Sequence, residues 1–336
     1  MADRRDAPRS GPRPWSRAWS DAQRFWPEGP GAAGPAAHFR TSTHVGPVLA
    51  SALLVLLREV DRRLGHPAAL DVVDVGAGRG ELLAELLRQA DEPLARRLRP
   101  VGVDLLPRPD ALDPRVAWIQ GAAPACVPTL RGLLIAHEWL DELPVDVVVV
   151  GDDGGLRTVL VDDDGTESLG GPVDASTAAW VRRWWGGPAS GDRAEHGGAR
   201  DAAWRACVQR VEAGTALAVD YGHVRADRDT GRYAAGTVTG YRDGRTSAPV
   251  PDGSVNLTAH VAVDSLVAAD LRGTAYPPVR QRDALLALGV SGALPEIALA
   301  RTDPDAYADA LQLASQASEL LDPAGLGGFW WLRHDV

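Results

Sequence analysis

A stretch with the pattern of a strand, a glycine loop and a helix constrains the fold of this 336-residue chain more than any other feature. An apolar run at residues 72–75 ends in three glycines, Gly76, Gly78 and Gly80, and the apolar spacing of residues 81–90 predicts a helix directly afterwards. Glycine permits a tight turn and lets the backbone approach a ligand closely. The pattern therefore predicts an α/β fold with a ligand-binding loop after this strand.

The alternation of strands with helices or loops continues beyond the glycine loop. Further strands are predicted at residues 101–105, 116–119, 133–136 and 216–221, with an aromatic strand suited to a sheet edge at residues 329–332. Strands joined by such crossovers imply a parallel sheet that is covered on both faces. A short helix is predicted after residue 136, ending at Pro144.

Two regions depart from this alternation. Residues 1–37 are rich in Pro, Gly and Ala, which predicts a flexible N-terminal arm, although an aromatic cluster within it could pack onto the rest of the chain. That cluster is Trp15, Trp19, Phe25 and Trp26. Residues 145–150 and 156–161 flank a glycine-rich turn, which predicts a hairpin, and helical stretches follow near residues 176–185 and 202–211. These elements predict an insertion at about residues 145–212.

Composition narrows the class of protein. The net charge of −10 disfavours nonspecific binding to nucleic acid. Two distant cysteines, Cys126 and Cys207, predict neither a disulfide scaffold nor a zinc site, and the acidic run at residues 162–164 is more typical of a solvated turn than of a metal site. No signal peptide and no apolar run near the ~20 residues of a membrane span is recognised. We therefore expect a cytoplasmic protein without a bound metal.

The spacing of the glycines distinguishes between two nucleotide-like cofactors. A dinucleotide fingerprint requires G-x-G-x-x-G, and its sixth position here is Glu81. Asp74, just before the loop, would repel a pyrophosphate but would accept hydrogen bonds from the ammonium group of S-adenosylmethionine (SAM). The loop therefore predicts SAM, with Asp74, Gly76, Gly78 and Gly80 as binding residues.

Two further residues fit a nucleoside. Asp104 ends the second predicted strand, where an acidic side chain accepts hydrogen bonds from both ribose hydroxyls in this type of fold, although a turn-forming aspartate is the alternative. Gln120 closes the third strand, at the expected position for contact with the adenine edge.

Several motifs, in the same order along residues 38–332, resemble those of the MidA-like SAM-dependent methyltransferases. They are residues 38–42, the glycine loop, residues 136–144, 219–223, 240–242 and 256–261, and residues 281–289. The resemblance implies a class I methyltransferase fold, with a Rossmann-like, mostly parallel seven-stranded sheet and an inserted hairpin and helical substrate region. The corresponding domain is residues 38–336, with a substrate-side segment at about residues 222–280.

The resemblance also suggests the reaction. The mitochondrial member of this family is a protein arginine methyltransferase needed for assembly of respiratory complex I, so the resemblance implies arginine methylation here. The chain departs from the family pattern at His137, where asparagine is usual, and in its shortened aromatic N-terminal segment.

An arginine acceptor requires carboxylates that bind and orient the guanidinium group. Glu138 and Asp141 follow the fourth strand and would share a face of a helical turn, and the alternative is an exposed acidic face or a helix cap. His137 is a candidate proton acceptor or a structural histidine. Thr41 could cap a helix, but its family counterpart lies near the cofactor.

Three functions fit the sequence. The first is a methyltransferase with a protein substrate. The second is an assembly or docking factor that retains the SAM-binding fold, suggested by a tryptophan-rich insertion that contains Trp180, Trp184, Trp185 and Trp204. The third is a small-molecule methyltransferase. The sequence leaves open whether the chain forms a homodimer.

Overall fold

The structure is a computed structural model that describes residues 11–26, 29–34, 41–185, 189–268 and 273–336. The chain forms two compact units, each assembled from three stretches. The sheet unit consists of Gly34–Leu140, Ala203–Gly222 and Val267–Val336, and the hairpin unit consists of Met1–Ala33, Asp141–Ala202 and His223–Leu266. Within the described residues, no helix is both long and apolar enough to cross a membrane.

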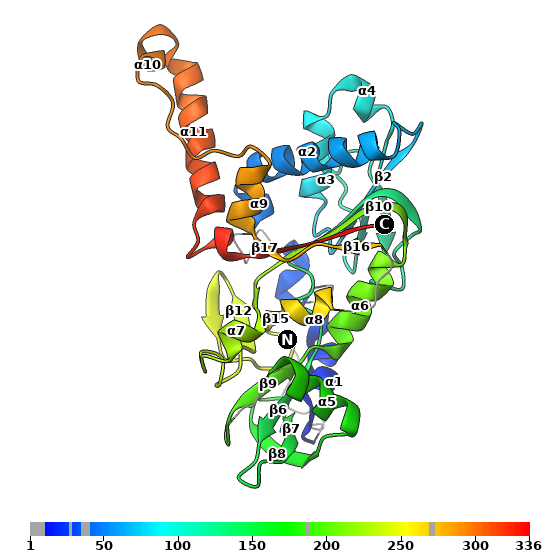
Figure 1. Ribbon diagram of the computed structural model, residues 1–336, viewed down its shortest axis with the longest axis vertical. Helices are drawn as coiled ribbons and strands as arrows, with labels where there is room; N and C mark the ends of the chain where they lie inside the picture. Colours follow the sequence, from blue (N-terminus) through cyan, green and yellow to red (C-terminus); the bar gives the residue numbers. More distant parts are fainter. Residues whose placement is uncertain (1–10, 27–28, 35–40, 186–188, 269–272) are drawn as a thin grey trace, which may run out of the picture. The chain divides into compact units, whose positions relative to one another are not determined.

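An eight-stranded sheet forms the centre of the sheet unit (Figure 1). Its order is β16-β18-β10-β5-β2-β3-β4, and β17 also pairs with β18. The strands are β2 (Leu70–Val75), β3 (Leu98–Asp104), β4 (Ala117–Gln120), β5 (Leu130–His137), β10 (Val211–Asp220), β16 (Thr274–Ala275), β17 (Val279–Arg280) and β18 (Trp330–Asp335). The strands from β10 to β4 are parallel, and β18 is antiparallel to β10, so the predicted mostly parallel sheet is confirmed.

Two details of the sheet differ from the expectation. The sheet has eight strands rather than seven, because the two short strands β16 and β17 both pair with β18. The aromatic strand β18 therefore does not lie at the edge. Trp331 of this strand is buried, at 5 % exposed, and Trp330 is half-buried.

Helices cover one face of this sheet with apolar side chains. They are α2 (Val48–Arg63), α3 (Glu81–Gln89) and α9 (Gln281–Ala287). Helix α11 (Pro304–Leu321) packs against α2 and α9, and the shorter α4 (Glu92–Ala95) and α10 (Leu299–Thr302) lie in the same unit. Leu53 and Leu83 of these helices belong to one buried cluster with Val72, Leu133 and Leu217 of the strands. The residues that alternate with these along the strands, such as Val73 and Leu134, are also buried. The spacing of apolar residues thus explains why both faces are inaccessible to water.

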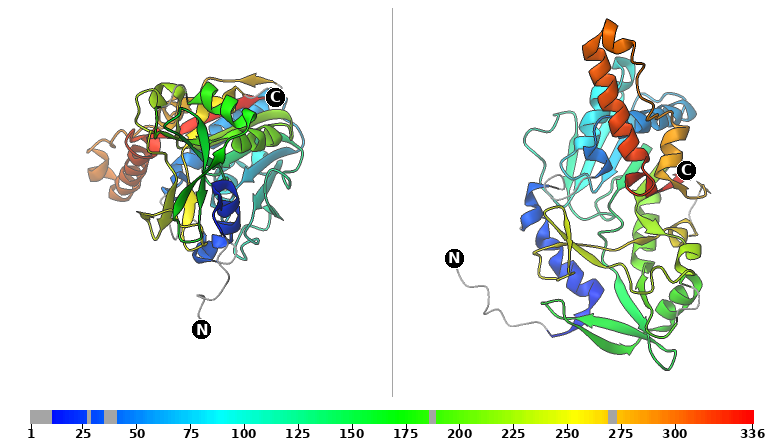
Figure 2. Two further views of the ribbon diagram at one scale, coloured as in Figure 1. Left: turned by 90° about the horizontal axis from the view of Figure 1, so that it is seen from below. Right: turned by 90° about the vertical axis from the view of Figure 1, so that its left-hand side faces the viewer.

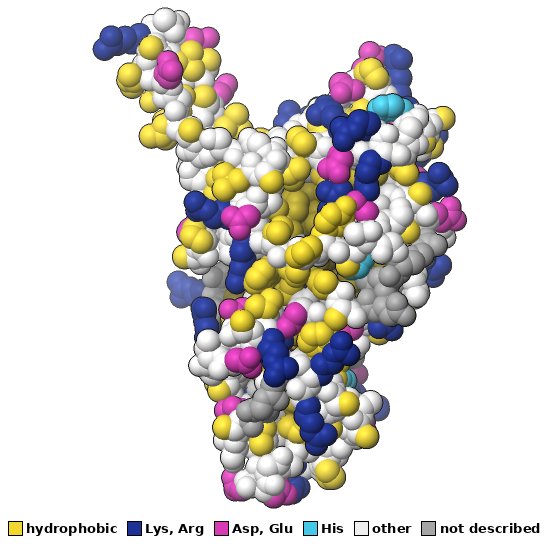
Figure 3. Space-filling model, in the orientation of Figure 1, with side chains coloured by type: hydrophobic (Ala, Val, Ile, Leu, Met, Phe, Trp, Pro, Cys, Tyr) yellow, Lys and Arg dark blue, Asp and Glu magenta, His cyan; other side chains and the backbone are white. Residues whose placement is uncertain are grey.

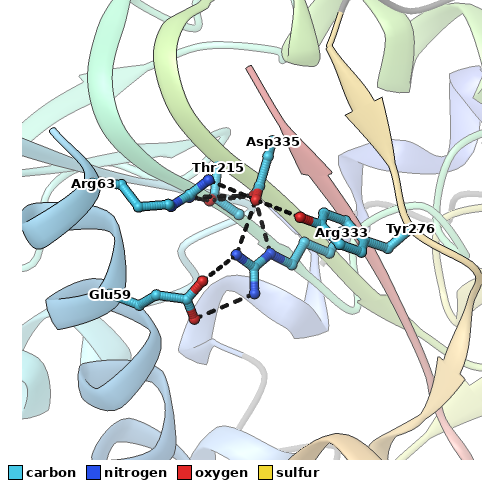
Figure 4. A network of polar contacts seen from close by, with 6 residues as sticks. All are labelled: Glu59, Arg63, Thr215, Tyr276, Arg333 and Asp335. Atoms are coloured by element: carbon cyan, nitrogen blue, oxygen red, sulfur yellow. Dashed lines mark hydrogen bonds and ion pairs between the residues drawn. The ribbon is translucent and has the colours of Figure 1, made fainter.

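A network of charged and polar side chains joins the C-terminal strand β18 to α2 and β10 by hydrogen bonds and ion pairs (Figure 4). The Asp335 carboxylate accepts hydrogen bonds from Arg63 Nη1 at 2.6 Å, Thr215 Oγ1 at 2.7 Å and Tyr276 Oη at 3.0 Å. Arg333 donates to the same carboxylate and to Glu59. Every carboxylate in this network has an arginine partner.

An antiparallel sheet organises the hairpin unit, in the order β1-β7-β6-β9 with β8 paired to β7. Its strands are β1 (Arg13–Pro14), β6 (Asp146–Val150), β7 (Leu156–Val161), β8 (Glu167–Pro172) and β9 (Arg193–His196). Other strands of this unit are β12 (Thr239–Arg242), β13 (Arg245–Ser247), β14 (Asn256–Thr258) and β15 (Val261–Ala262). Its helices are α1 (Trp15–Ala22), η2 (Gln23–Phe25), η3 (Pro30–Ala33), α5 (Ala175–Trp184), α7 (Arg225–Arg228) and α8 (Val263–Val267). The predicted hairpin is confirmed as β6 and β7. Helix α6 (Gly198–Val208) contains the boundary between the stretches of the two units.

The prediction of a flexible arm is wrong for much of residues 1–37. Residues Trp15–Ala22 form α1, which lies against β6 and β7 (Figure 2). Trp15 and Trp19 are 1 % and 2 % exposed and pack with Val147 and Val159, as the aromatic cluster allowed. A helix as short as α1 is stabilised mainly by the packing of its apolar face, and the residues that it packs against lie more than 100 positions away in the sequence. The local sequence pattern therefore does not predict this helix. Within this arm, residues 1–10, 27–28 and 35–37 lie outside the described residues.

Candidate functional site

The three glycines of the predicted loop all have left-handed backbone conformations. Their φ angles are 72° at Gly76, 59° at Gly78 and 79° at Gly80, a region that strains residues with a Cβ atom. A Cβ atom at Gly76 would also lie only 3.1 Å from Cδ1 of Trp139. The loop therefore requires glycine for both its turn and its close contact with Trp139.

Asp74 is a buried carboxyl group at the end of β2. Its residue is 3 % exposed, and burial, together with the negative charges of Asp104 and Glu81, holds its pKa well above the usual range. A cation at this carboxyl group would offset the cost of burying the charge. Asp74 is thus suited to the ammonium group of the predicted cofactor.

Asp104 lies at the end of the neighbouring strand and touches the glycine loop directly. Its Oδ2 accepts a hydrogen bond from the backbone N–H of Gly78, and its Oδ1 accepts one from Leu106, both at 2.8 Å. Burial raises the pKa of Asp104, the backbone donors lower it, and the resulting value is about 6. The strand register pairs Asp104 with Gln120, which is exposed and donates to the carbonyl of Leu105. Asp104 and Gln120 therefore lie side by side at the carboxyl edge of the sheet.

Glu138 follows the last residue of β5 and is held in an unusual conformation. Its φ angle is 52°, its N–H donates to the carbonyl of Val219, and its Oε1 accepts a hydrogen bond from the backbone N–H of Ser42 at 3.3 Å. A non-glycine residue in the left-handed region costs about 1–2 kcal/mol. Such strain persists only where neighbouring groups fix it, which is common at functional sites.

His137 is buried beside this glutamate. Its Nδ1 lies 3.5 Å from Glu138 Oε1, and its Nε2 has no hydrogen-bond partner within the described part of the chain. Burial, and to a smaller extent the nearby His44, lower the pKa of His137 to about 4. The imidazole is therefore neutral at neutral pH.

The predicted helix between residue 136 and Pro144 is wrong. Residues 138–144 form bends and a turn, because Glu138 is left-handed and the next N–H groups bond elsewhere. The Asp220 carboxylate accepts hydrogen bonds from the N–H groups of Leu140 at 2.9 Å and Tyr221 at 3.0 Å. Asp220, to which the sequence assigned no role, thus anchors the turn that carries Glu138.

Asp141 therefore does not share a helical face with Glu138, and it belongs to a stretch of the hairpin unit. It is 3 % exposed, and its carbonyl accepts hydrogen bonds from Arg200 Nη2 at 2.6 Å and from the N–H of Ala259. Burial, followed by the charge of Asp141, raises the pKa of Tyr241. Arg200 is 2 % exposed and also donates to the carbonyls of Leu143, Ala259 and His260. Nothing in the sequence pattern marked this arginine.

Thr41 does not cap a helix through its side chain. It precedes the short helix η5 (Ser42–His44), but its Oγ1 lies 2.6 Å from His44 Nδ1 and 2.7 Å from Thr43 Oγ1. His44 Nε2 is in turn 3.5 Å from Glu81 Oε1, at the start of α3. Burial raises the pKa of Glu81, but hydrogen bonding to His44 and to backbone N–H groups outweighs it, and the pKa is lowered. The adjacent motif residues 38–40 lie outside the described residues.

Sequence reasoning missed two of these residues. Trp139 packs against Gly76 and thereby joins the glycine loop to the turn after β5, and His44 joins Thr41 to Glu81. A tryptophan within a predicted acidic helix gave no signal for the first contact. For the second, the closeness of His44 to Thr41 in the sequence was a weak signal, and nothing in the sequence pointed to Glu81 as its other partner.

Comparison with known proteins agrees with this geometry. Residues 48–274, more than half of the chain, match the family described as "Putative S-adenosyl-L-methionine-dependent methyltransferase". A likely methyl transferase from Burkholderia thailandensis, solved with S-adenosyl-homocysteine, is 24 % identical over 97 % of this chain and 88 % of its own, with a TM-score of 0.77. A native structure of an uncharacterized protein from the same organism has the same identity and coverage and a TM-score of 0.74. A search of curated proteins gave no match.

The two solved structures establish the fold, and the family match establishes the chemistry. The strand order, the left-handed glycine loop and the acidic residue at the carboxyl end of each of two neighbouring strands all suit SAM. The chain belongs to the family of S-adenosyl-L-methionine-dependent methyltransferases, and SAM is its cofactor.

Proposed function

We propose that this enzyme transfers the methyl group of SAM to an arginine nitrogen of a protein substrate, as a MidA-like member of its family. The observation that carries the proposal is Glu138, at the carboxyl end of β5. Its backbone is in the strained left-handed conformation, and its carboxylate is held by the N–H of Ser42. Ligands of open α/β sheets bind at this edge. A carboxylate there is suited to bind a guanidinium group and to orient one nitrogen.

The cofactor roles follow from the same edge. We assign Asp74 to the ammonium group, Asp104 to the ribose hydroxyls, Gln120 to the adenine edge, and the three glycines to close backbone approach. Thr41 acts indirectly in this proposal, because its hydroxyl is bonded to Thr43 and His44. When bound, SAM supplies an electrophilic methyl group on sulfur.

The chain's own side chains would then prepare the acceptor. Glu138 orients the guanidinium group and favours a localised lone pair on the nitrogen that is methylated. His137 lies 3.5 Å from Glu138 and stays the candidate acceptor of the proton that the nitrogen releases, although burial, which lowers its pKa to about 4, makes it a weak base. Asp141 stays a second candidate carboxylate for the acceptor.

Labelled SAM incubated with purified enzyme and cell lysate tests the proposal. We expect a labelled protein band that contains methylated arginine by mass spectrometry. The Glu138→Gln variant should lose about 100-fold or more of the labelling and still bind SAM, because it retains the shape but not the charge. Glu212→Gln, at an exposed position of β10, is the matched control. Labelling of a small molecule only, or equal labelling by Glu138→Gln, would overturn the proposal.

The structure gives less support to a docking factor, the function that the tryptophan-rich insertion suggested. Trp185 and Trp204 of the tryptophan-rich region are 5 % and 0 % exposed, and Trp180 donates to Asp201 at 2.7 Å. Two of the four indole rings are thus buried, and the other two, Trp180 and Trp184, are half-buried, so the four do not form one exposed aromatic patch. Apolar side chains are exposed instead around α10 and α11, where Leu294 is 74 % and Ile297 69 % exposed (Figure 3).

A further inference from the structure

A glutamine is buried among the apolar side chains of the sheet unit. Gln281, the first residue of α9, is 0 % exposed, and its neighbours Leu285 and Trp331 belong to the main core cluster. Its Oε1 accepts a hydrogen bond from Trp331 Nε1 at 3.0 Å. Its Nε2 donates to Ser42 Oγ at 3.1 Å and to the carbonyl of Leu326 at 2.9 Å. A buried amide is tolerated in such a core only when its polar atoms are paired in this way.

These partners determine which way the amide faces. The indole N–H of Trp331 is a donor only, so it must face the amide oxygen, and the carbonyl of Leu326 is an acceptor only, so it must face the amide nitrogen. The amide group can therefore not turn over. Its remaining N–H is directed to Ser42 Oγ.

Ser42 connects this amide to the catalytic edge. It is 0 % exposed, and its own backbone N–H donates to Glu138 Oε1. Hydrogen bonds thus run from the indole of Trp331, through Gln281 and Ser42, to the carboxylate of Glu138. Asp220 and Val219 fix the backbone of the Glu138 turn independently of these bonds.

We propose that Gln281 and Ser42 are positioning residues that fix the carboxylate of Glu138 for the methyl acceptor. The inference rests on the proposed role of Glu138 and adds two residues whose hydrogen bonds lead to its side chain rather than to the backbone of its turn. Misplacement of a reacting group by about 1 Å costs on the order of 100-fold in rate. Removing the hydrogen bonds that hold the Gln281 amide should therefore lower the rate of methyl transfer strongly and the affinity for the cofactor only slightly.

Three variants each remove a different part of the chain of hydrogen bonds that runs from Trp331 to Glu138. Ser42→Ala removes the oxygen that Gln281 reaches but keeps the N–H that faces Glu138. Ser42→Pro also removes this N–H, and proline is acceptable at the first position of a helical turn. Trp331→Phe removes the donor to Gln281. Trp330→Phe is the matched control, because its indole N–H donates to the carbonyl of Gly222, outside this chain of bonds.

The first readout does not depend on any acceptor. The pKa of Glu138 is measured by NMR on protein with carboxyl-¹³C glutamate, its signal is assigned from Glu138→Gln, and the titration of His137 is followed alongside. Ser42→Pro should raise the pKa of Glu138 by about one unit, since a hydrogen bond to the charged form is lost. Ser42→Ala should raise it less, and Trp330→Phe should leave it unchanged.

The second readout is methyl transfer to the labelled protein. Ser42→Ala and Trp331→Phe should lower kcat about tenfold and change KM for SAM less than twofold, with Trp330→Phe near wild type. Melting temperature and S-adenosylhomocysteine affinity identify variants that fail to fold. An unchanged pKa of Glu138 in folded Ser42→Pro would overturn the inference. A raised pKa in an enzyme that labels no protein would retain it and overturn the proposed substrate instead.

Discussion

Two groups of carboxylates on the same sheet are held in opposite ways. Asp335, in the C-terminal network of Figure 4, has arginine neighbours. Burial raises its pKa, but the hydrogen bonds to Arg333 and Thr215 and the charges of Arg333 and Arg63 outweigh burial, and the pKa is lowered. Asp74, which is buried, and Asp104, which is half-buried, lie at the carboxyl ends of the neighbouring strands β2 and β3, and both pKa values are raised. The negative charge of Asp335 is offset by arginine side chains of the protein itself. Asp74 and Asp104 have no such cation beside them among the described interactions, so they ionise less readily than an ordinary aspartate unless a ligand supplies the positive charge.

The difference separates structural from functional charge. Arginine partners in the C-terminal network stabilise the attachment of β18. At the strand ends, the sheet instead concentrates negative charge around the glycine loop, so that a cationic, hydroxyl-rich ligand gains binding energy there. Changes in the network should therefore affect stability alone, and changes at the strand ends should affect the cofactor.

The largest effect is expected at Asp104. Asp104→Ala removes the acceptor for the ribose hydroxyls and the partner of the Gly78 N–H, so SAM affinity should fall about 100-fold. Isothermal titration calorimetry measures this loss. Asp335→Asn serves as the comparison and should bind SAM like wild type. Equal affinity losses in the two variants would show that the distinction between the groups is wrong.

The network should respond in stability rather than binding. Arg333→Met leaves Glu59 and Asp335 without this guanidinium group, and the free energy of unfolding should fall by about 2 kcal/mol, between the values for exposed and buried pairs. Urea denaturation measures the change, with Arg88→Met, in an exposed pair with Glu85, as a nearly silent control. A change in SAM affinity upon Arg333→Met would contradict this account.

Two left-handed glycines isolate the role of the loop. Gly65→Ala has open space at φ 73°, so it should cost only about 1 kcal/mol of stability. Gly76→Ala at φ 72° adds a methyl group 3.1 Å from Trp139, and it should also weaken SAM binding about tenfold. Melting temperatures measure the loss of stability in the two variants, and calorimetry measures their affinities for SAM. Similar SAM affinities would mean that Trp139 does not set the position of the loop.

The smallest effect concerns pH. The pKa of Asp104 is about 6 without ligand, and a ligand that favours the ionised form lowers it, so binding is strongest above pH 6 and releases a proton near it. At pH 5.5 only about a quarter of this carboxyl is ionised, so SAM affinity should be about fourfold weaker than at pH 8. Calorimetry in two buffers measures the released proton. Asp104→Asn should show less pH dependence.

The sequence was most informative where structure is local. The segment from β2 through the glycines to α3 was predictable, because alternation, glycine and helical spacing occur within about 20 residues. It failed where distant contacts decide the conformation. Helix α1 depends on β6 and β7, and the turn after β5 depends on Asp220, about 80 positions away.

The site shows the same limit. Asp74, Asp104 and the glycines are identifiable from the position of strand ends. The hydrogen bond from Gln281 to Ser42 spans 239 positions, so no spacing rule predicts it. Position within a motif therefore predicts the cofactor better than the groups that orient the acceptor.

Thermal melting of Asp74→Asn, with and without S-adenosylhomocysteine at pH 7.5, tests the central distinction most directly. The substitution removes a buried carboxyl group whose ionisation is unfavourable, so the unliganded variant should melt at or above the wild-type temperature. The ligand should raise the melting temperature of wild type but not of the variant. An unliganded variant that melts well below wild type, and is still stabilised by the ligand, would contradict the account.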